Sequence, residues 1–376
     1  MAILIYRYYK IRAIAWAGAL SFMVILALTL ELLFGYFAPL EAGRWGEFPA
    51  LQIHPTRVYS LKPDQETHLK YNNYDYTLRT NSLGLANPEI DIKRPDTNTK
   101  RILIIGDAFS MPEGMEYEYA YPSLLQARLE EDFASGSIQV INAGVTGYGP
   151  AEQYPQLKEL GPLLQPGIVI YEFFINEFAE ASMSAEDRLK SIGLIPRYGS
   201  TYTSLMNRSQ AVANLRKFQS RLKESLIGAP ATWRYGKSLL EFYETGENLL
   251  YSQKSLDTIR NYLKLMLQVC QQLGSDFVIY FVPGAVAVSD TSNIAYFPLD
   301  QDLTDRSEYD LNLPLRNLRK VTDPLGIPVV DLTPFLKLHP IQPVYFPESW
   351  HWNKEGHKLV ADVIVKDLLD RGLLSQ

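Results

Sequence analysis

Residues 101–110 read RILIIGDAFS, and this stretch decides which fold the chain is expected to adopt. Four consecutive apolar residues, 102–105, are typical of a strand that is covered on both faces, as strands of parallel sheets are. The turn that follows places Ala108 at the carboxyl end of the strand, where open α/β folds bind their ligands. The sequence therefore predicts a ligand site with the methyl group of Ala108 in its wall.

The rest of the sequence alternates strand and helix patterns around this first strand. Further strands are predicted at 138–142, 168–174, 277–282 and 327–332. Helices are predicted at 122–133, at 256–273 with Gly274 as the cap, and at 354–369. Strands that alternate with helices form right-handed βαβ units. The expected fold is therefore a three-layer α/β/α sandwich with a mainly parallel five-stranded sheet.

The N-terminal segment has the composition of a membrane span. Residues 13–30 carry no charge, and apolar character continues to Leu40 with only Glu31 intervening. About 20 such residues are needed to cross a bilayer. A cleaved signal peptide is the alternative, although its apolar core is usually about 7–15 residues long and ends in small residues. We expect a retained transmembrane helix over residues 13–34.

The charges around this segment predict its orientation. Arg7, Lys10 and Arg12 precede it, whereas Glu31 and Glu41 lie at or beyond its far end. Basic residues favour the cytoplasmic side of a membrane. Residues 1–12 are therefore expected in the cytoplasm and the main domain outside it. In a bacterium this corresponds to a single-pass inner-membrane protein with a periplasmic domain.

Composition narrows the classes of partner and cofactor. The net charge is −6, and acidic and basic residues are interspersed, so no basic stripe indicates a nucleic-acid partner. Cys270 is the only cysteine, which excludes an intramolecular disulfide, and its place on an apolar helix face predicts a buried side chain. The five histidines show no zinc-binding spacing. We expect neither a metal nor a cofactor.

The domain organisation follows from changes in composition. Residues 35–98 are rich in Pro, Asn, Asp and Tyr, and predict a stalk with a small β-like apron. Residues 99–376 form the main domain, into which 179–254 is inserted as a helical segment. An amphipathic helix is expected from Val212 to Leu226, with basic residues on its other faces. This insertion is either a solvated surface, a lid or a docking surface for a partner.

Several short blocks, taken in order, resemble one enzyme family. The first block, Gly106-Asp107-Ala108-Phe109-Ser110, resembles the Gly-Asp-Ser signature of the SGNH/GDSL hydrolases, with Ala108 in place of the nucleophilic serine. Matching blocks stand at 80–85 (TNSLGL), 142–149 (NAGVTGYG), 174–177 (FINE) and 351–357 (HWNKEGH). The block at 80–85 is similar to bacterial, membrane-anchored envelope members of that family.

The resemblance implies a role for each site residue. His351 corresponds to the catalytic base, and Glu348 or Ser349 stands where the family has the aspartate that orients it. The oxyanion hole corresponds to the backbone amides of Ala108 and Gly144 and to the side chain of Asn176. Each has a structural alternative: a packed histidine for His351, a turn with positive φ for Gly144, and a loop cap for Asn176.

Four further residues belong to this candidate site. Asp107, Glu177 and Trp350 adjoin the matched positions and are candidate substrate-binding residues. Ser110 is a second hydroxyl near position 108. At about 100° per residue it faces elsewhere along a helix that starts there, so we interpret it as a helix cap.

The resemblance implies ester hydrolysis or O-acyl transfer on an acylated cell-envelope polysaccharide, beside a membrane-bound acyltransferase. Because Ala108 lacks a nucleophile, the alternative is a non-catalytic protein that binds glycan or docks a partner. Whether the chain is an enzyme stays open at this point. A nucleotide-binding Rossmann domain is disfavoured, because the first turn lacks the Gly-x-Gly-x-x-Gly spacing.

Overall fold

The computed structural model describes residues 2–37, 50–71, 74–92, 99–134, 136–194, 209, 211–212, 238–298 and 301–374. Its centre is a sheet of five parallel strands in the order β6-β5-β7-β8-β9. The strands are β5 (Lys100–Ile105), β6 (Ile138–Asn142), β7 (Ile168–Phe174), β8 (Asp276–Val282) and β9 (Val329–Asp331). This confirms the predicted α/β class with a five-stranded parallel sheet.

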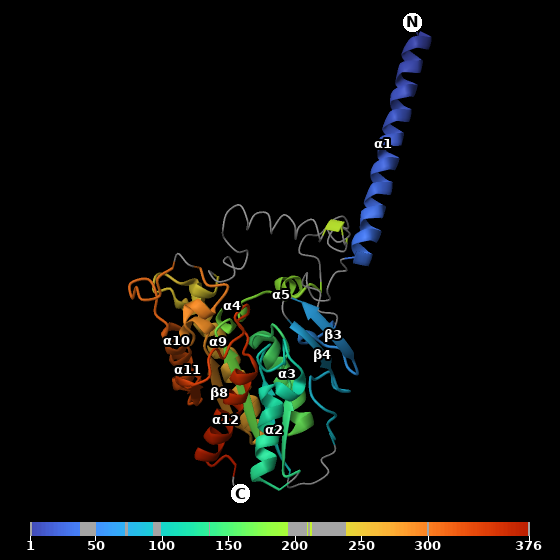
Figure 1. The fold of residues 1–376 in the computed structure, drawn as a ribbon. Helices are drawn as coiled ribbons and strands as arrows, with labels where there is room; N and C mark the ends of the chain where they lie inside the picture. The colour runs from blue at the N-terminus through green and yellow to red at the C-terminus, as the bar shows by residue number, and fades with distance from the viewer. Residues whose placement is uncertain are drawn as a thin grey trace.

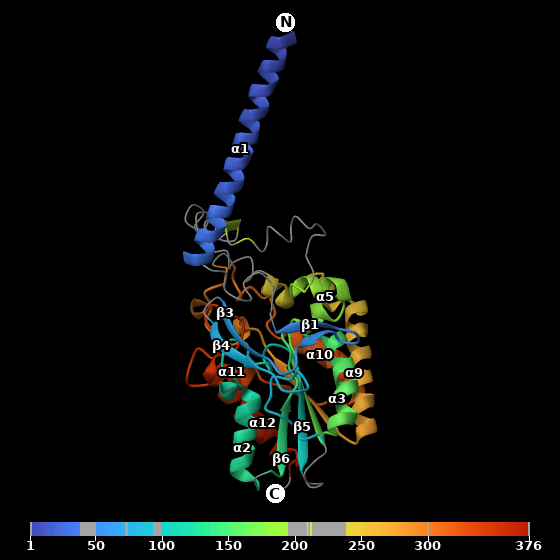
Figure 2. The same cartoon turned by 90° about the vertical axis from the view of Figure 1, so that its right-hand side faces the viewer.

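Helices cover both faces of the sheet (Figure 2). On one face α2 (Tyr121–Asp132) packs against α12 (Lys354–Asp370), and on the other α3 (Pro150–Leu164) packs against α9 (Gln253–Leu273). Two further helices, α10 (Leu313–Thr322) and α11 (Thr333–Leu338), contact α9 and α12 respectively. The described helices and strands thus form the predicted three layers.

Local chemistry explains where two of these elements begin and end. Helix α9 ends at Gly274, which adopts the left-handed conformation (φ 67°) that favours glycine, and Cys270 is fully buried on its apolar face. Both predictions are confirmed. Strand β9 is shorter than the predicted 327–332, and Pro328, which has no N–H to donate, lies just before its first residue.

Two antiparallel hairpins precede the main sheet. The first pairs β1 (Leu51–His54) with β2 (Val58–Leu61), and the second pairs β3 (Glu66–Tyr71) with β4 (Tyr74–Arg79). In β4 the residues Tyr74, Tyr76 and Leu78 are buried and alternate with more exposed ones, as one covered face requires. The hairpins lie near the end of the sheet toward α1 (Figure 1).

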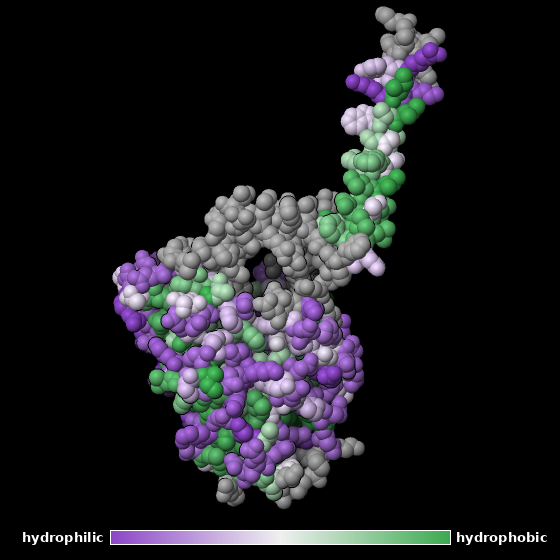
Figure 3. All heavy atoms as spheres, viewed as in Figure 1, coloured by the Kyte–Doolittle hydropathy of each residue, from purple (hydrophilic) through white to green (hydrophobic). Residues whose placement is uncertain are grey.

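The N-terminal helix α1 (Ala2–Phe37) extends away from the α/β body (Figure 1). Its segment Arg7–Phe34 has 28 residues and contains an 18-residue window with a mean hydropathy of 2.2, so it is long and apolar enough to cross a membrane. Figure 3 shows hydrophobic side chains along this helix, whereas the body is mainly hydrophilic on the same face. Length and composition are those of a transmembrane anchor or of a signal sequence.

The inserted segment is described only in part. It contains the end of α4 (Glu177–Glu180), α5 (Ala185–Ser191) and two short 3-10 helices, Glu241–Tyr243 and Leu249–Tyr251. The amphipathic helix expected from Val212 to Leu226 lies outside the described residues beyond its first position.

Candidate functional site

A cavity of about 420 Å³ lies at the carboxyl ends of β5 and β7, and we call it the Ala108 cavity. Three predicted site residues that are far apart in the sequence, Ala108, Asn176 and His351, all line it. Two of the candidate substrate-binding residues, Asp107 and Trp350, line it as well. The position of the cavity agrees with the general rule that parallel sheets bind ligands at the carboxyl ends of their strands.

The turn after β5 is what places Ala108 in the cavity wall. The Asp107 carboxylate accepts a hydrogen bond from the N–H of Phe109 (2.9 Å), and the Asp107 carbonyl accepts one from Met111 (2.9 Å). These bonds hold residues 108–114 in turns, and the next α-helix, α2, begins only at Tyr121. The sequence interpretation of a helix starting at this point was therefore wrong.

Ser110 is correspondingly not a helix cap. It is fully buried, and its hydroxyl lies 2.7 Å from the hydroxyl of Tyr121 and 3.1 Å from Oε2 of Glu172. Ser110 is not among the residues that line the Ala108 cavity, so it does not replace the missing nucleophile. Its hydroxyl instead bridges the turn to α2 and β7.

His351 is held from both sides of its ring. The indole N–H of Trp350 donates to Nε2 (3.0 Å), while Nδ1 lies 3.1 Å from the Tyr74 hydroxyl and 3.3 Å from Oγ of Ser349. An indole N–H can only donate, so Nε2 must be unprotonated, and in the neutral ring the proton resides on Nδ1. Burial lowers the pKa of His351 below its ordinary value, which favours this neutral ring.

Glu348 is not positioned as the acid that orients His351. Its side chain is exposed, and the N–H of Ser349 donates to the carbonyl of Phe346 (3.2 Å), which closes a turn with Glu348 on its outer side. The structure places two hydroxyl groups against Nδ1 rather than a carboxylate. A hydroxyl orients the ring but does not stabilise an imidazolium as a carboxylate does.

Tyr74 is the site residue that the sequence interpretation missed. It lies at the start of β4, and besides facing Nδ1 of His351 its hydroxyl donates to Ser349. Its ring also packs edge-on against Phe346, with centroids 5.4 Å apart. The alternating pattern of β4 indicates a buried face, but no motif indicates that this face reaches a histidine 277 residues away.

Gly144 does not face the Ala108 cavity. Its N–H donates to Oδ1 of Asn142 (3.0 Å), and Gly144 is not among the residues that line the cavity. Gly144 does not have a positive φ. A left-handed turn therefore does not require this glycine. A Cβ added at this position would lie 2.5 Å from the backbone nitrogen of Met111. It instead gives the chain at Ser110 and Met111 room to pass.

Asn176 and Glu177 have different surroundings although they are neighbours. Nδ2 of Asn176 donates to Glu180 (3.2 Å) within the cavity wall. Glu177 is fully buried and accepts hydrogen bonds from Gln153 and Tyr171, both at 2.9 Å. Glu177 therefore anchors α4 to the core. The structure does not place it where a substrate would bind.

The cavity wall is acidic. Among its described residues are Asp107, Glu113, Glu180 and Glu241, but no lysine or arginine. Burial, together with the charge of nearby Glu113, raises the pKa of Asp107. Such a wall disfavours anionic ligands and is compatible with neutral or cationic ones. Within the described part of the chain, no group of three His, Cys, Asp or Glu residues is arranged to hold a metal ion.

Arg188 lies behind this wall and is almost completely buried. Its guanidinium pairs with Glu180 (3.1 Å) and Glu152 (3.3 Å), and donates to the carbonyls of Gly147 (2.9 Å) and Glu180 (3.1 Å). Gly147 and Glu180 both line the cavity. Arg188 thus joins α3, α4 and the loop after β6 into one wall.

Glu180 predicts a measurable dependence of stability on pH. Burial raises its pKa from 4.5 to about 8, although the charge of Arg188 acts in the opposite direction. Between these values the folded state holds the proton more firmly than the unfolded state, so the free energy of unfolding should fall as pH rises. The slope is at most about 1.4 kcal/mol per pH unit for one group.

The variant Glu180→Gln should remove this contribution. We expect its unfolding free energy, measured by urea denaturation of the full chain in detergent, to fall less steeply than that of the wild type between pH 7 and 8. In this window the buried histidines are neutral in the folded state, because burial lowers their pKa values, and their titration in the unfolded state is the same for both proteins. Parallel slopes for the two proteins would contradict the raised pKa of Glu180.

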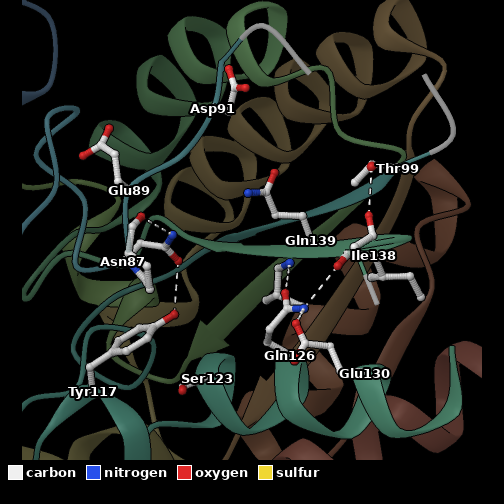
Figure 4. Close-up of a pocket in the computed structure, with 13 residues that line it drawn as sticks. Asn87, Glu89, Asp91, Thr99, Tyr117, Ser123, Gln126, Glu130, Ile138 and Gln139 are labelled. Carbon is white, nitrogen blue, oxygen red and sulfur yellow. Dashed lines mark hydrogen bonds between the residues drawn. The ribbon is translucent and has the colours of Figure 1, made fainter. Parts of the chain in front are cut away.

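A second cavity, of about 340 Å³, lies beside β6 on the outer edge of the sheet (Figure 4). In it the side-chain amide of Gln126 accepts from the N–H of Val140 (2.6 Å) and donates to the carbonyl of Ile138 (3.1 Å). Asn87 accepts from the N–H of Asn142 (3.0 Å) in the same manner. These contacts satisfy three backbone groups on the outer side of the edge strand, so polar side chains here have a structural function.

Comparisons with known proteins give only distant likenesses. No protein-family model matches the sequence, and no curated protein matches it. The chain is similar to the psychrotrophic esterase EstA from Pseudoalteromonas sp. (14% identity, TM-score 0.39, covering 72% of this chain and 99% of that one). It is also similar to an alpha/beta hydrolase from the metagenome of Lake Arreo, Spain (13%, TM-score 0.41, 74% and 97%). A catalytic mutant of an acetylxylan esterase from Geobacillus stearothermophilus is a third (11%, TM-score 0.40, 73% and 96%). These likenesses assign no activity to this chain.

Proposed function

We propose that this chain is an SGNH/GDSL hydrolase-like protein of the bacterial cell envelope that binds an acylated polysaccharide without serine-based hydrolysis. In this proposal residues 13–34 are a retained inner-membrane anchor, and the α/β domain lies in the periplasm. The partners are an acylated envelope polysaccharide or a similar ester and, in the same process, a membrane-bound acyltransferase.

The observation that carries this proposal is the methyl group of Ala108 in a cavity that also contains His351 and Asn176. His351 and Asn176 line the same cavity, which is the arrangement that acyl transfer uses for its base and for an oxyanion donor. Serine chemistry additionally needs a hydroxyl at position 108 and a carboxylate on Nδ1 of His351, and neither is present. The absence of basic residues from the described wall fits a neutral glycan.

Hydrolysis of an aryl acetate by the full chain in detergent tests the loss of chemistry. We expect the wild type to match the His351→Ala variant, which lacks the base. Ala108→Ser should gain about tenfold over that background, less than the roughly 10²–10⁴-fold that a well-positioned base contributes. The gain should be small because no carboxylate orients His351. Turnover by the wild type that depends on His351 would refute the proposal of lost catalysis.

Binding is tested with O-acetylated and chemically deacetylated forms of one neutral polysaccharide, followed by tryptophan fluorescence. We expect the acetylated form to bind more tightly, because the cavity at Ala108 has room for an acyl group. Ala108→Leu, which fills that space, should abolish the difference between the two forms. Equal affinity for both forms in the wild type would show that the ester is not recognised.

A further inference from the structure

The contact between Trp350 and His351 has a consequence for how the Ala108 cavity accepts a ligand. Nε2 of His351 is the atom that takes a proton from a hydroxyl in acyl-transfer sites. Here that atom already accepts the indole N–H of Trp350 at 3.0 Å. The two rings are nearly perpendicular, with an interplanar angle of 80°.

We propose that the indole N–H of Trp350 takes the place of the hydroxyl that Ala108 lacks. Nε2 of His351 is then blocked and cannot act as a base until a ligand hydroxyl displaces the indole. Trp350 is in these terms a positioning residue, because it acts through His351. The inference rests on the proposed function for the identity of the ligand, a hydroxyl-bearing glycan. The indole contact itself does not depend on that function.

Two features of the structure support displacement by a ligand rather than a fixed core contact. Trp350 is only partly buried and lines the cavity, whereas Trp352 is fully buried, with its ring packed against Phe109 at 4.7 Å. The opposite side of the histidine ring is held independently by Tyr74 and Ser349. His351 can therefore keep its orientation and its Nδ1 proton when the indole leaves.

The indole contact is tested without any activity measurement. The chain has five tryptophans, so an indole ¹⁵N–¹H spectrum of the full chain in detergent contains five signals, and the one absent from Trp350→Phe belongs to Trp350. We expect this signal to shift in His351→Ala and on acid titration, because a protonated Nε2 cannot accept. The Trp352 signal, assigned through Trp352→Phe, serves as the matched control. A Trp350 signal that responds to neither change would overturn the proposal.

The displacement is tested in the Ala108→Ser background, where a hydroxyl is supplied at the site. Removing a hydrogen bond of about 0.5–1.5 kcal/mol corresponds to roughly a 2- to 12-fold change. We expect Ala108→Ser/Trp350→Phe to exceed Ala108→Ser by this factor in kcat/KM for aryl acetate, and Ala108→Ser/Trp352→Phe not to exceed it.

The possible failures are distinguishable. A double variant no faster than Ala108→Ser, with the indole signal still reporting the contact, would show that the indole does not compete with a hydroxyl and would overturn the displacement. Neither the indole spectrum nor the kcat/KM comparison depends on whether acetylation changes the affinity for the glycan. A failed glycan-binding experiment would therefore contradict the proposed ligand but not the proposal that the indole of Trp350 blocks Nε2 of His351.

Discussion

Replacing Arg188 with alanine is expected to lower the free energy of unfolding by about 3–5 kcal/mol, the range for breaking a buried ion pair from one side. The side chains of Arg188 and Glu152 are each only 2% exposed, and that of Glu180 is 14% exposed. Without the guanidinium, two buried carboxyl groups lose their countercharge, and two carbonyl groups lose their donor. The loss should be larger at pH 8 than at pH 5, because protonation neutralises the carboxyl groups at the lower pH.

Urea denaturation of the full chain in detergent, followed by circular dichroism, measures this loss. Lys190→Ala is the matched control, because it also removes a cation from α5. The partner of Lys190, Glu186, is largely exposed. We expect the control to unfold as the wild type does. An Arg188→Ala protein as stable as the wild type would show that Arg188 does not hold the cavity wall together.

Gly144→Ala is the second substitution with a large expected effect. An added Cβ would lie 2.5 Å from the nitrogen of Met111 and 2.8 Å from the backbone carbon of Ser110. Because these are backbone atoms, the turn that carries Ala108 would have to move. Overpacking of this kind usually destabilises a protein by about 1–3 kcal/mol.

The same denaturation experiment tests this expectation. Gly246→Ala is the control, because an added Cβ there meets nothing within 4 Å and φ is not in the left-handed region. It should leave stability unchanged or raise it slightly. If Gly144→Ala were as stable as the control but lost glycan binding, Gly144 would have the substrate-facing role that the family resemblance implies.

The sequence was sufficient to predict the centre of the main sheet, because β5, β7 and β8 are short, nearly continuous apolar runs. The predicted limits of β6 and β7 match those observed, and β8 begins one residue earlier than predicted. Burial on both faces leaves such strands little choice of residue type. The same argument predicted that Ala108 would lie at a ligand-binding edge, and it does line the cavity.

The candidate site was harder to predict, because its contacts depend on loops. Whether Glu348 or Ser349 faces His351 is decided by the turn that begins at Phe346, and neither spacing nor composition specifies that turn. Gly144 has a packing function that only the path of the neighbouring chain reveals. Tyr74 comes from a separate hairpin, and a contact across such a distance leaves no periodic signal in a single sequence.

The side-chain amide of Gln126 has one more consequence, which concerns self-association. A strand at the edge of a sheet is a template onto which another chain can add, and proteins that leave it open tend to aggregate. By bonding to the backbone of Val140 and Ile138, Gln126 occupies positions that an incoming strand would need. A second copy of this chain would therefore have to displace Gln126 before it could add a strand to β6.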